Sequence, residues 1–464
     1  MVINRILTCM VLASVAATAF ADDWHQWRGP DRTGVSSETG LLDKWPDGGP
    51  PLLWKTKRAG VGYASVAIKD GRVITMGDRK SAQFVIAYSE KDGKELWKRR
   101  VDKSYQNRYG DGPRCTPTID GDRVYALSAT GRLYCLNAED GKTKWTANLV
   151  SRFGGGAFAQ IRRRGGSGNQ AGAGNRGAAG NRGARGNRAG GGNRSRGGNG
   201  GAARKNLVWG MSESPLIEDN MVICNSGGTG GSIVALDKMT GKVIWRSKGM
   251  DDAPSYASAI AATIGDIRQI IAFTHKGTVG LRASDGKLLW RYDGAANAIA
   301  NCTTPVLDGE HLFLTAGYDA GCALVKLTAD GEEMKAEEVY ANRTMINHHG
   351  GVILVDGNIY GASNQTWMCM DFKTGERKWR ARGVGKGSLT AADGKLIFVG
   401  EKGTIGLAEA TPEEYREISK FEIEPLQKNL WAYPVVHNKR LYIRNGNELL
   451  CYDLSAAAGA GAEG

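Results

Sequence analysis

The side chains best suited to bind a ligand are widely separated along this 464-residue chain. They combine both signs of charge, hydrogen-bond donors and acceptors, and aromatic rings, which suits an anionic or planar ligand if they converge. A hydrated channel mouth without a ligand would show the same mixture, and the sequence leaves both interpretations open. The residues are Tyr63, Arg114, Glu213, Tyr256, Asn301, His348, His349, Lys386 and Tyr433.

The pair His348-His349 raises the question of a metal site. Neighbouring residues of a strand point to opposite faces, so both rings could contact one ion only if this stretch is a loop. No third His, Cys or carboxylate stands at a recognisable ligand spacing from the pair. The sequence therefore predicts no metal site, and it contains no Gly-x-Ser-x-Gly, His-Glu-x-x-His or phosphate-loop motif.

A repeat supplies the elements that would bring these side chains together. Residues 235–245 carry a Thr-Gly turn followed by Trp, and related copies recur along the chain. Each copy alternates apolar and polar residues between Gly-containing turns, which indicates four short antiparallel strands. A four-stranded unit repeated every forty-odd residues is typical of a β-propeller. The repeated Trp residues are Trp54, Trp97, Trp145, Trp245, Trp290 and Trp379.

The repeats predict an all-β fold, an eight-bladed β-propeller over residues 51–457. Seven blades are expected at 63–102, 115–149, 212–249, 256–294, 302–345, 348–385 and 387–424. The eighth begins at Tyr433 with only three strands, and residues 51–57 are expected to supply its fourth strand and close the ring. The nine candidate residues then stand at the starts of the innermost strands, around one channel mouth.

The Trp residues have a structural role in this interpretation. Each indole can lie between neighbouring blades, with its N–H bonded to a main-chain carbonyl. The fifth and seventh blades lack the Trp. We therefore expect these two blades to be looser or more irregular.

The motif at residues 235–245 resembles the quinoprotein, or PQQ-like, β-propeller superfamily, and it matches every specified position of Ala-x-Asp-x-x-Thr-Gly-Lys-x-x-Trp. The resemblance covers nearly all of the chain outside an insert and the two ends. Residues 24–30 and 347–351 resemble exported PQQ-binding-like propellers of planctomycete-type bacteria. The superfamily includes PQQ-dependent dehydrogenases and also non-catalytic members, such as the propeller lipoprotein of the outer-membrane assembly machinery.

A dehydrogenase of this superfamily would bind PQQ with Ca²⁺. The resemblance implies Glu213 and Asn301 as Ca²⁺ ligands and Asp319 as a weak candidate for the catalytic base. The superfamily's adjacent Cys pair is missing here, as is the Cys-x-x-Cys-His motif of c-type haem. These departures argue against intact PQQ catalysis.

Three terminal segments lie outside the predicted propeller core. Residues 1–21 have the pattern of a signal peptide, with Arg5, an apolar run and Ala19-Phe20-Ala21 before the cleavage point. Residues 22–50 form an N-terminal extension, and 458–464 are expected to be a disordered tail. We therefore expect export to the periplasm, the cell envelope or the medium.

Residues 151–205 are predicted to be a disordered insert between the second and third blades. They contain eleven Arg, one Lys and no acidic residue, with a Gly-Asn-Arg repeat of six residues. The whole chain carries a formal net charge of +13, so the rest of it is nearly neutral. A solvated loop without a specific partner is the first interpretation. If the insert has a partner, anionic envelope polymers are expected, whereas export disfavours nucleic acid.

Together these features favour an exported, non-catalytic binding or scaffold module of the cell envelope, with protein partners possible. The alternative is a PQQ-dependent quinoprotein oxidoreductase that acts on alcohols or sugars. A third interpretation is recognition of a small molecule or glycan at the channel mouth without turnover. The sequence does not specify the oligomeric state.

Overall fold

The computed structural model describes residues 23–154, 209–228 and 230–459. The predicted signal peptide therefore lies outside the described residues, as do most of the predicted insert and the end of the predicted tail. The described ends of the insert differ from the prediction. Ser151 to Phe153 belong to helix α1 (Leu149–Phe153), which Asn148 caps at its N-terminus and which buries Leu149 and Phe153.

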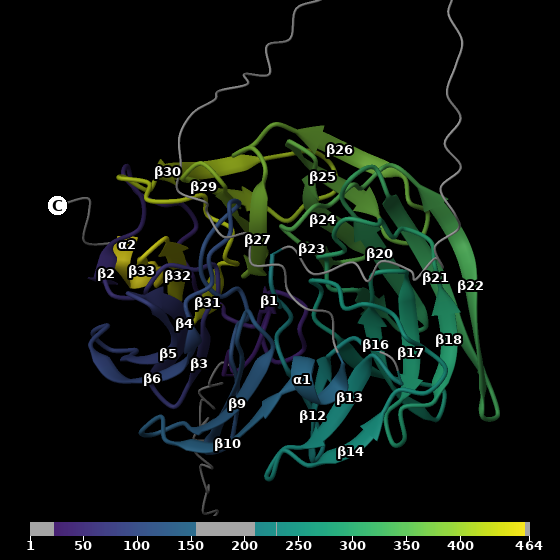
Figure 1. Ribbon diagram of the computed structural model, residues 1–464. Coiled ribbons are helices and arrows are strands. Elements are labelled where there is room, and N and C mark those ends of the chain that lie inside the picture. Colours follow the sequence, from purple (N-terminus) through teal and green to yellow (C-terminus); the bar gives the residue numbers. More distant parts are fainter. Residues whose placement is uncertain (1–22, 155–208, 229, 460–464) are drawn as a thin grey trace, which may run out of the picture.

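Eight antiparallel sheets form the ring, which confirms the predicted all-β, eight-bladed propeller (Figure 1). Each blade has four strands, and the first strand lies nearest the channel. The first four blades are β3 (Ala67–Lys69), β4 (Arg72–Arg79), β5 (Ala82–Ser89) and β6 (Glu95–Lys103); β7 (Thr118–Asp120), β8 (Arg123–Leu127), β9 (Arg132–Asn137) and β10 (Thr143–Asn148); β11 (Leu216–Glu218), β12 (Met221–Asn225), β13 (Ile233–Asp237) and β14 (Val243–Arg246); and β15 (Ile260–Ile264), β16 (Ile267–Phe273), β17 (Thr278–Arg282) and β18 (Leu288–Tyr292).

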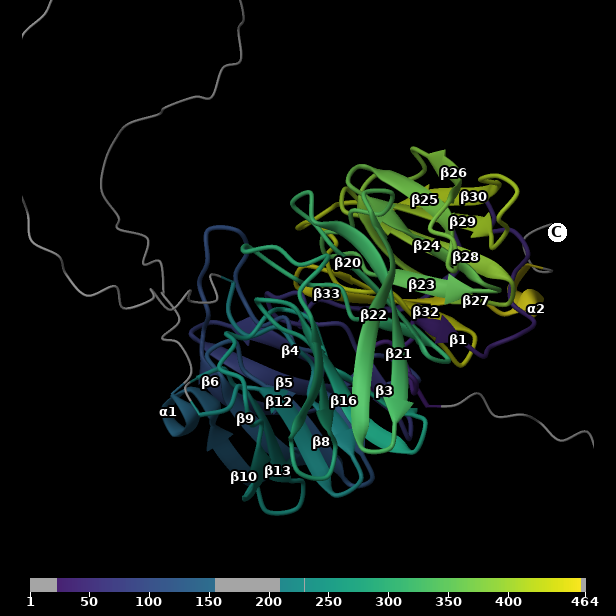
Figure 2. The same ribbon diagram turned by 90° about the vertical axis from the view of Figure 1, so that its right-hand side faces the viewer.

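The remaining blades follow the same order. The hairpin of the fifth blade reaches past its neighbours because its two strands are ten residues long (Figure 2). These blades are β19 (Val306–Asp308), β20 (His311–Ala316), β21 (Gly321–Asp330) and β22 (Glu333–Asn342); β23 (Val352–Val355), β24 (Asn358–Ser363), β25 (Thr366–Asp371) and β26 (Arg377–Ala381); β27 (Gly387–Ala392), β28 (Lys395–Gly400), β29 (Thr404–Glu409) and β30 (Glu417–Glu422); and β31 (Val435–His437), β32 (Arg440–Asn445), β33 (Glu448–Asp453) and β2 (Leu52–Thr56).

The N-terminal strand closes the ring as predicted. Strand β2 pairs antiparallel with β33, and Trp54 lies opposite Cys451. In Figure 1 the purple β2 lies beside the yellow β33. A short helix, α2 (Ala456–Gly459), follows β33; it begins before the predicted tail and ends inside it. Within the described part of the chain, neither helix has the length and apolar character needed to cross a membrane.

The segment that precedes β2 occupies the central channel. We call residues 24–36 the channel segment; its last two residues form β1 (Val35–Ser36), which pairs in parallel with β27 near the centre of the ring in Figure 1. The segment bonds to all eight blades. The partners, in blade order, are Ile68, Ile119, Pro215, Ala259, Thr304, Val352, Ala391 and Val436. The sequence predicted only an extension here, without a position for it.

Aromatic side chains join most neighbouring blades. The indole Nε1 of Trp97 donates to Ala138 O at 2.9 Å, and the ring covers Gly141, where a Cβ would clash with it. Trp54, Trp145, Trp245 and Trp379 also donate to a main-chain carbonyl of the following blade. Trp290 differs, because the absent side chain of Gly280 lets its Nε1 donate to Gln269 of its own blade.

The expectation of a more irregular blade is confirmed for the fifth, whose outer hairpin is longer than those of its neighbours, but both blades carry another aromatic residue in place of the Trp. In the fifth blade Tyr340 takes the Trp position, since its hydroxyl donates to Phe372 O at 2.9 Å and its ring covers Gly375. In the seventh blade Phe421 lies directly over Gly49 and packs against Trp45. The longer β21–β22 hairpin moves the aromatic away from the turn, so spacing from the turn does not find it.

Candidate functional site

The loops that lead into the first strands open at one end of the channel. Because adjacent strands of a blade are antiparallel, the turns between the second and third strands open on that same face. Side chains from both sets of loops therefore meet at this end, which we call the channel mouth. Most of the predicted site residues lie in these loops.

One side of the mouth is a stack of rings and one cation. The Arg114 guanidinium lies 5.3 Å from the ring centre of Tyr63, and Trp431 packs on Tyr63 at 4.8 Å with an angle of 35° between the rings. Tyr63 N donates to Pro113 O, which holds the tyrosine beside the Arg114 loop. Trp431 also contacts the His349 ring at 5.6 Å.

The other side is a polar cluster. His349 Nε2 donates to Glu401 Oε1 at 2.6 Å, and Lys386 Nζ lies 3.5 Å from the same oxygen. Lys386 also donates to His348 Nδ1 at 2.7 Å, which leaves His348 Nε2 to donate to the Tyr318 hydroxyl at 2.9 Å. The bond from Glu401 N to Lys386 O fixes these two loops side by side.

Burial and neighbouring charge set the ionisation of this cluster. Burial, with the nearby His349 and Lys386, lowers the pKa of His348 to about 3. Burial alone would raise the pKa of Glu401, but the His349 hydrogen bond and the Lys386 charge outweigh it and lower that pKa to about 2. Near neutral pH the cluster therefore holds a neutral His348 and an ionised Glu401.

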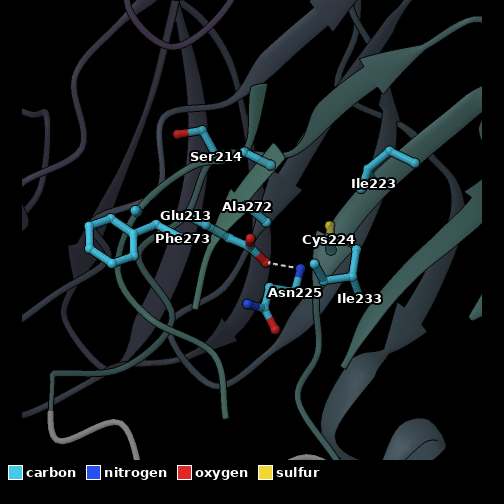
Figure 3. Close-up of a pocket in the computed structure, with 10 residues that line it drawn as sticks. Glu213, Ser214, Ile223, Cys224, Asn225, Ile233, Ala272 and Phe273 are labelled. Atoms are coloured by element: carbon cyan, nitrogen blue, oxygen red, sulfur yellow. Dashed lines mark hydrogen bonds between the residues drawn. The ribbon is translucent and has the colours of Figure 1, made fainter. Parts of the chain in front are cut away.

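Glu213 lies deeper than the mouth cluster. Its side chain is buried and accepts from Asn225 N at 2.6 Å, in a small cavity between the third and fourth blades (Figure 3). The cavity is about the size of one water molecule. Burial raises the pKa of Glu213 to about 8, and the nearby Arg32 charge only partly opposes this.

The other predicted residues are held in structural contacts. Asn301 is buried, with Oδ1 accepting from Asn297 N and Nδ2 donating to Thr274 O. Tyr256 N donates to Asn301 O, and its ring packs against Trp209. Tyr433 is buried against the channel segment, 4.5 Å from the Trp27 ring.

The residues that the resemblance assigned to PQQ chemistry do not fit a Ca²⁺ site. Ca²⁺ takes about six to eight oxygen ligands, whereas the cavity beside Glu213 is about the size of one water molecule, and Glu213 and Asn301 already accept from main-chain N–H groups. Asp319 is exposed in the β20–β21 turn with a left-handed φ of 63°. Across the described ranges, no group of three or more His, Cys, Asp or Glu side chains could hold a metal ion.

Three mouth residues escaped the sequence prediction: Trp431, Glu401 and Tyr318. Trp431 stands two residues before the predicted strand start at Tyr433. Glu401 and Tyr318 lie in turns between second and third strands, and the prediction considered only the loops that enter first strands. Those turns open on the same face, so the repeat pattern contained the signal that would have found them.

Comparisons with known proteins agree with the fold. The family model described as outer membrane protein assembly factor BamB matches residues 41–167 and 202–381, about two thirds of the chain. BamB from Moraxella catarrhalis superposes with a TM-score of 0.52 at 14% identity, over 86% of this chain and 97% of that one. A quinohemoprotein alcohol dehydrogenase from Comamonas testosteroni gives a TM-score of 0.60 at 11% identity, over 93% of this chain and 80% of that one. At these identities the likeness extends to the fold alone, and no curated protein matches the sequence significantly.

Proposed function

The chain belongs to the PQQ-like β-propeller family described as outer membrane protein assembly factor BamB, and from this premise we propose that it is an exported, non-catalytic binding module of the cell envelope. Its ligand site is the channel mouth. Both BamB and a quinohemoprotein alcohol dehydrogenase share the fold, so the choice between binding and catalysis depends on the site.

The observation that carries the proposal is the continuous set of contacts around the mouth. Arg114, Tyr63 and Trp431 lead through His349 and Glu401 to Lys386, His348 and Tyr318 without a break. The channel segment fills the space inside the ring and supports this face. A face of aromatic and polar groups, held in the loops of a propeller, suits ligand binding. The poor fit of Glu213 and Asn301 to Ca²⁺ argues against quinone catalysis.

The predicted basic insert supports a second part of the proposal. Its described ends belong to the same face, since α1 follows the fourth strand of its blade and Trp209 packs against Tyr256. We expect the insert to attract anionic envelope polymers. Deleting residues 155–205 should abolish salt-sensitive polyanion binding and leave folding intact. Unchanged polyanion binding would reject this role.

Redox titration separates binding from catalysis. The purified protein is titrated with PQQ and Ca²⁺, and dye reduction is followed with alcohols and sugars as substrates. We expect no substrate-dependent dye reduction. Saturable PQQ binding with turnover would overturn the non-catalytic proposal and identify a dehydrogenase.

A further inference from the structure

Two neighbours of Tyr63 at the mouth are incompletely paired: the Trp431 indole has no acceptor, and Arg114 has no carboxylate partner among the described residues. The Trp431 Nε1 atom is buried and has no partner. Arg114 donates only to two carbonyls of its own loop, Gly110 O at 3.0 Å and Gly112 O at 3.2 Å. In the described part of the chain, no carboxylate lies within ion-pair distance of Arg114. This side of the mouth therefore holds a cation without a carboxylate and a buried indole N–H without an acceptor, and an anion that reached both would satisfy them.

The opposite side offers partners for hydroxyl groups. His348 donates to the Tyr318 oxygen, so the Tyr318 hydroxyl hydrogen is available, and 43% of this side chain is exposed. Both protein contacts to the Glu401 carboxylate use Oε1, which leaves Oε2 as an acceptor. A hydroxyl both donates and accepts, so it matches this donor and acceptor together.

The two sides border one space. The Trp431 ring contacts the His349 ring at 5.6 Å, and His349 bonds to Glu401 at 2.6 Å. The His348 and His349 rings lie 4.9 Å apart, and His348 bonds to the Tyr318 hydroxyl. A ligand of one ring could contact both sides.

We propose that the channel mouth binds a sugar acid, with its carboxylate on Arg114 and the Trp431 N–H and its hydroxyls toward Tyr318 and Glu401. The proposal rests on the mouth being the ligand site of the proposed function, and it names the ligand class. A neutral sugar lacks the charge that Arg114 requires. An aromatic carboxylate lacks the hydroxyls that match Tyr318 and Glu401.

Calorimetric titration with three probes tests the ligand class. We expect the full-length protein to bind glucuronate at least tenfold more tightly than either glucose or benzoate, because only glucuronate satisfies both sides. Equal binding of benzoate would overturn the role of the hydroxyls, and equal binding of glucose would overturn the role of Arg114. Absence of glucuronate binding would overturn the proposal as a whole.

Matched variants test the site. Arg114→Gln should weaken glucuronate binding about tenfold to a hundredfold, and Tyr318→Phe should weaken it less. Arg108→Gln is the control, because Arg108 lies on the same loop but over Tyr109. If Arg114→Gln fails to fold by circular dichroism, Trp431→Phe replaces it, since it removes the second donor. Unchanged affinity in a folded variant at either position contradicts the proposal.

The glucuronate titration and the redox titration test separate claims. Turnover with PQQ would overturn the non-catalytic function whatever the affinity for glucuronate. No glucuronate binding, in a protein that also shows no turnover, would overturn only the ligand class.

Discussion

The interior of the channel and its mouth contain the same kinds of residue and use them differently. In the interior, Trp27 Nε1 donates to Thr304, and Arg32 donates to Gln26 and to three main-chain carbonyls of the third and fourth blades. At the mouth, Trp431 Nε1 has no acceptor and Arg114 has no carboxylate partner among the described residues. Arg and aromatic residues alone therefore do not mark a ligand site, and neither does an unsatisfied donor alone, because Nε and Nη1 of Arg28 in the channel segment also lack partners. What distinguishes the mouth is that its contacts continue to the exposed Tyr318.

Removing the channel segment should give the largest effect. Deletion of residues 22–36 takes away hydrogen bonds to every blade and leaves the buried carbonyls without donors. We expect the free energy of unfolding to fall by more than about 5 kcal/mol, measured by chemical denaturation. A deletion variant as stable as the parent would show that the interior does not depend on this segment, and the comparison would break.

A single interior arginine should give the next largest effect. Arg32→Met removes the donor of carbonyls in two blades, and we expect a loss of about 3 kcal/mol in the free energy of unfolding. Arg416→Met is the matched control, because Arg416 pairs with exposed glutamates on the rim, and its denaturation midpoint should not change. Equal denaturation midpoints for the two variants would contradict a structural role for Arg32.

The pH dependence of the free energy of unfolding tests the comparison at two glutamates, the buried Glu213 and the mouth residue Glu401. Glu213 is protonated more readily when folded, since burial raises its pKa from 4.5 to about 8. Its contribution to stability is present below about pH 4.5 and is lost as the pH rises toward 8. We expect Glu213→Gln to gain about 2 kcal/mol over the parent between pH 5 and pH 8. The quantity to compare is the difference in the free energy of unfolding between the variant and the parent at each pH. Asp78, whose pKa burial raises to about 7, adds the same pH dependence to both proteins.

Glu401 should behave in the opposite direction. Its folded pKa is lowered to about 2, so its contribution is present above about pH 4.5 and is lost as the pH falls toward 2. Glu401→Gln should therefore flatten the acid side of the stability profile. An unchanged acid limb would contradict the His349 and Lys386 contacts to this carboxylate.

The smallest effect on stability is expected at Arg114. Arg114→Gln should change the free energy of unfolding by less than about 1 kcal/mol, because the hydrogen bonds of its side chain stay within one loop. Chemical denaturation of Arg114→Gln and Arg32→Met under the same conditions measures the difference between the mouth and the interior. A loss as large as that of Arg32→Met would make Arg114 a structural residue like those of the interior.

The repeat made the ring predictable from sequence, because each blade carries its own turn and aromatic signal. Strand β2 could be identified as the closing strand since Trp54 repeats the same motif. Tyr340 could not be identified in this way, because a longer hairpin separates it from its turn.

The channel segment and the mouth contacts depend on tertiary structure. Trp27 and Arg32 have no periodic partner in the sequence, and three of the acceptors of Arg32 are main-chain carbonyls, which every residue possesses. Glu401 and His349 are 52 residues apart, so only the arrangement of whole blades brings them together. The polar starts of the first strands were visible in the sequence. The burial of Glu213, Asn301 and Tyr433 was not.

A crystal structure of the full-length protein grown with glucuronate would test the central claim most directly. The account predicts residues 24–36 inside the channel and the sugar acid at the mouth, with its carboxylate on Arg114 and Trp431 Nε1. A ligand seated within the ring in place of Trp27 and Arg32, above an empty mouth, would contradict it.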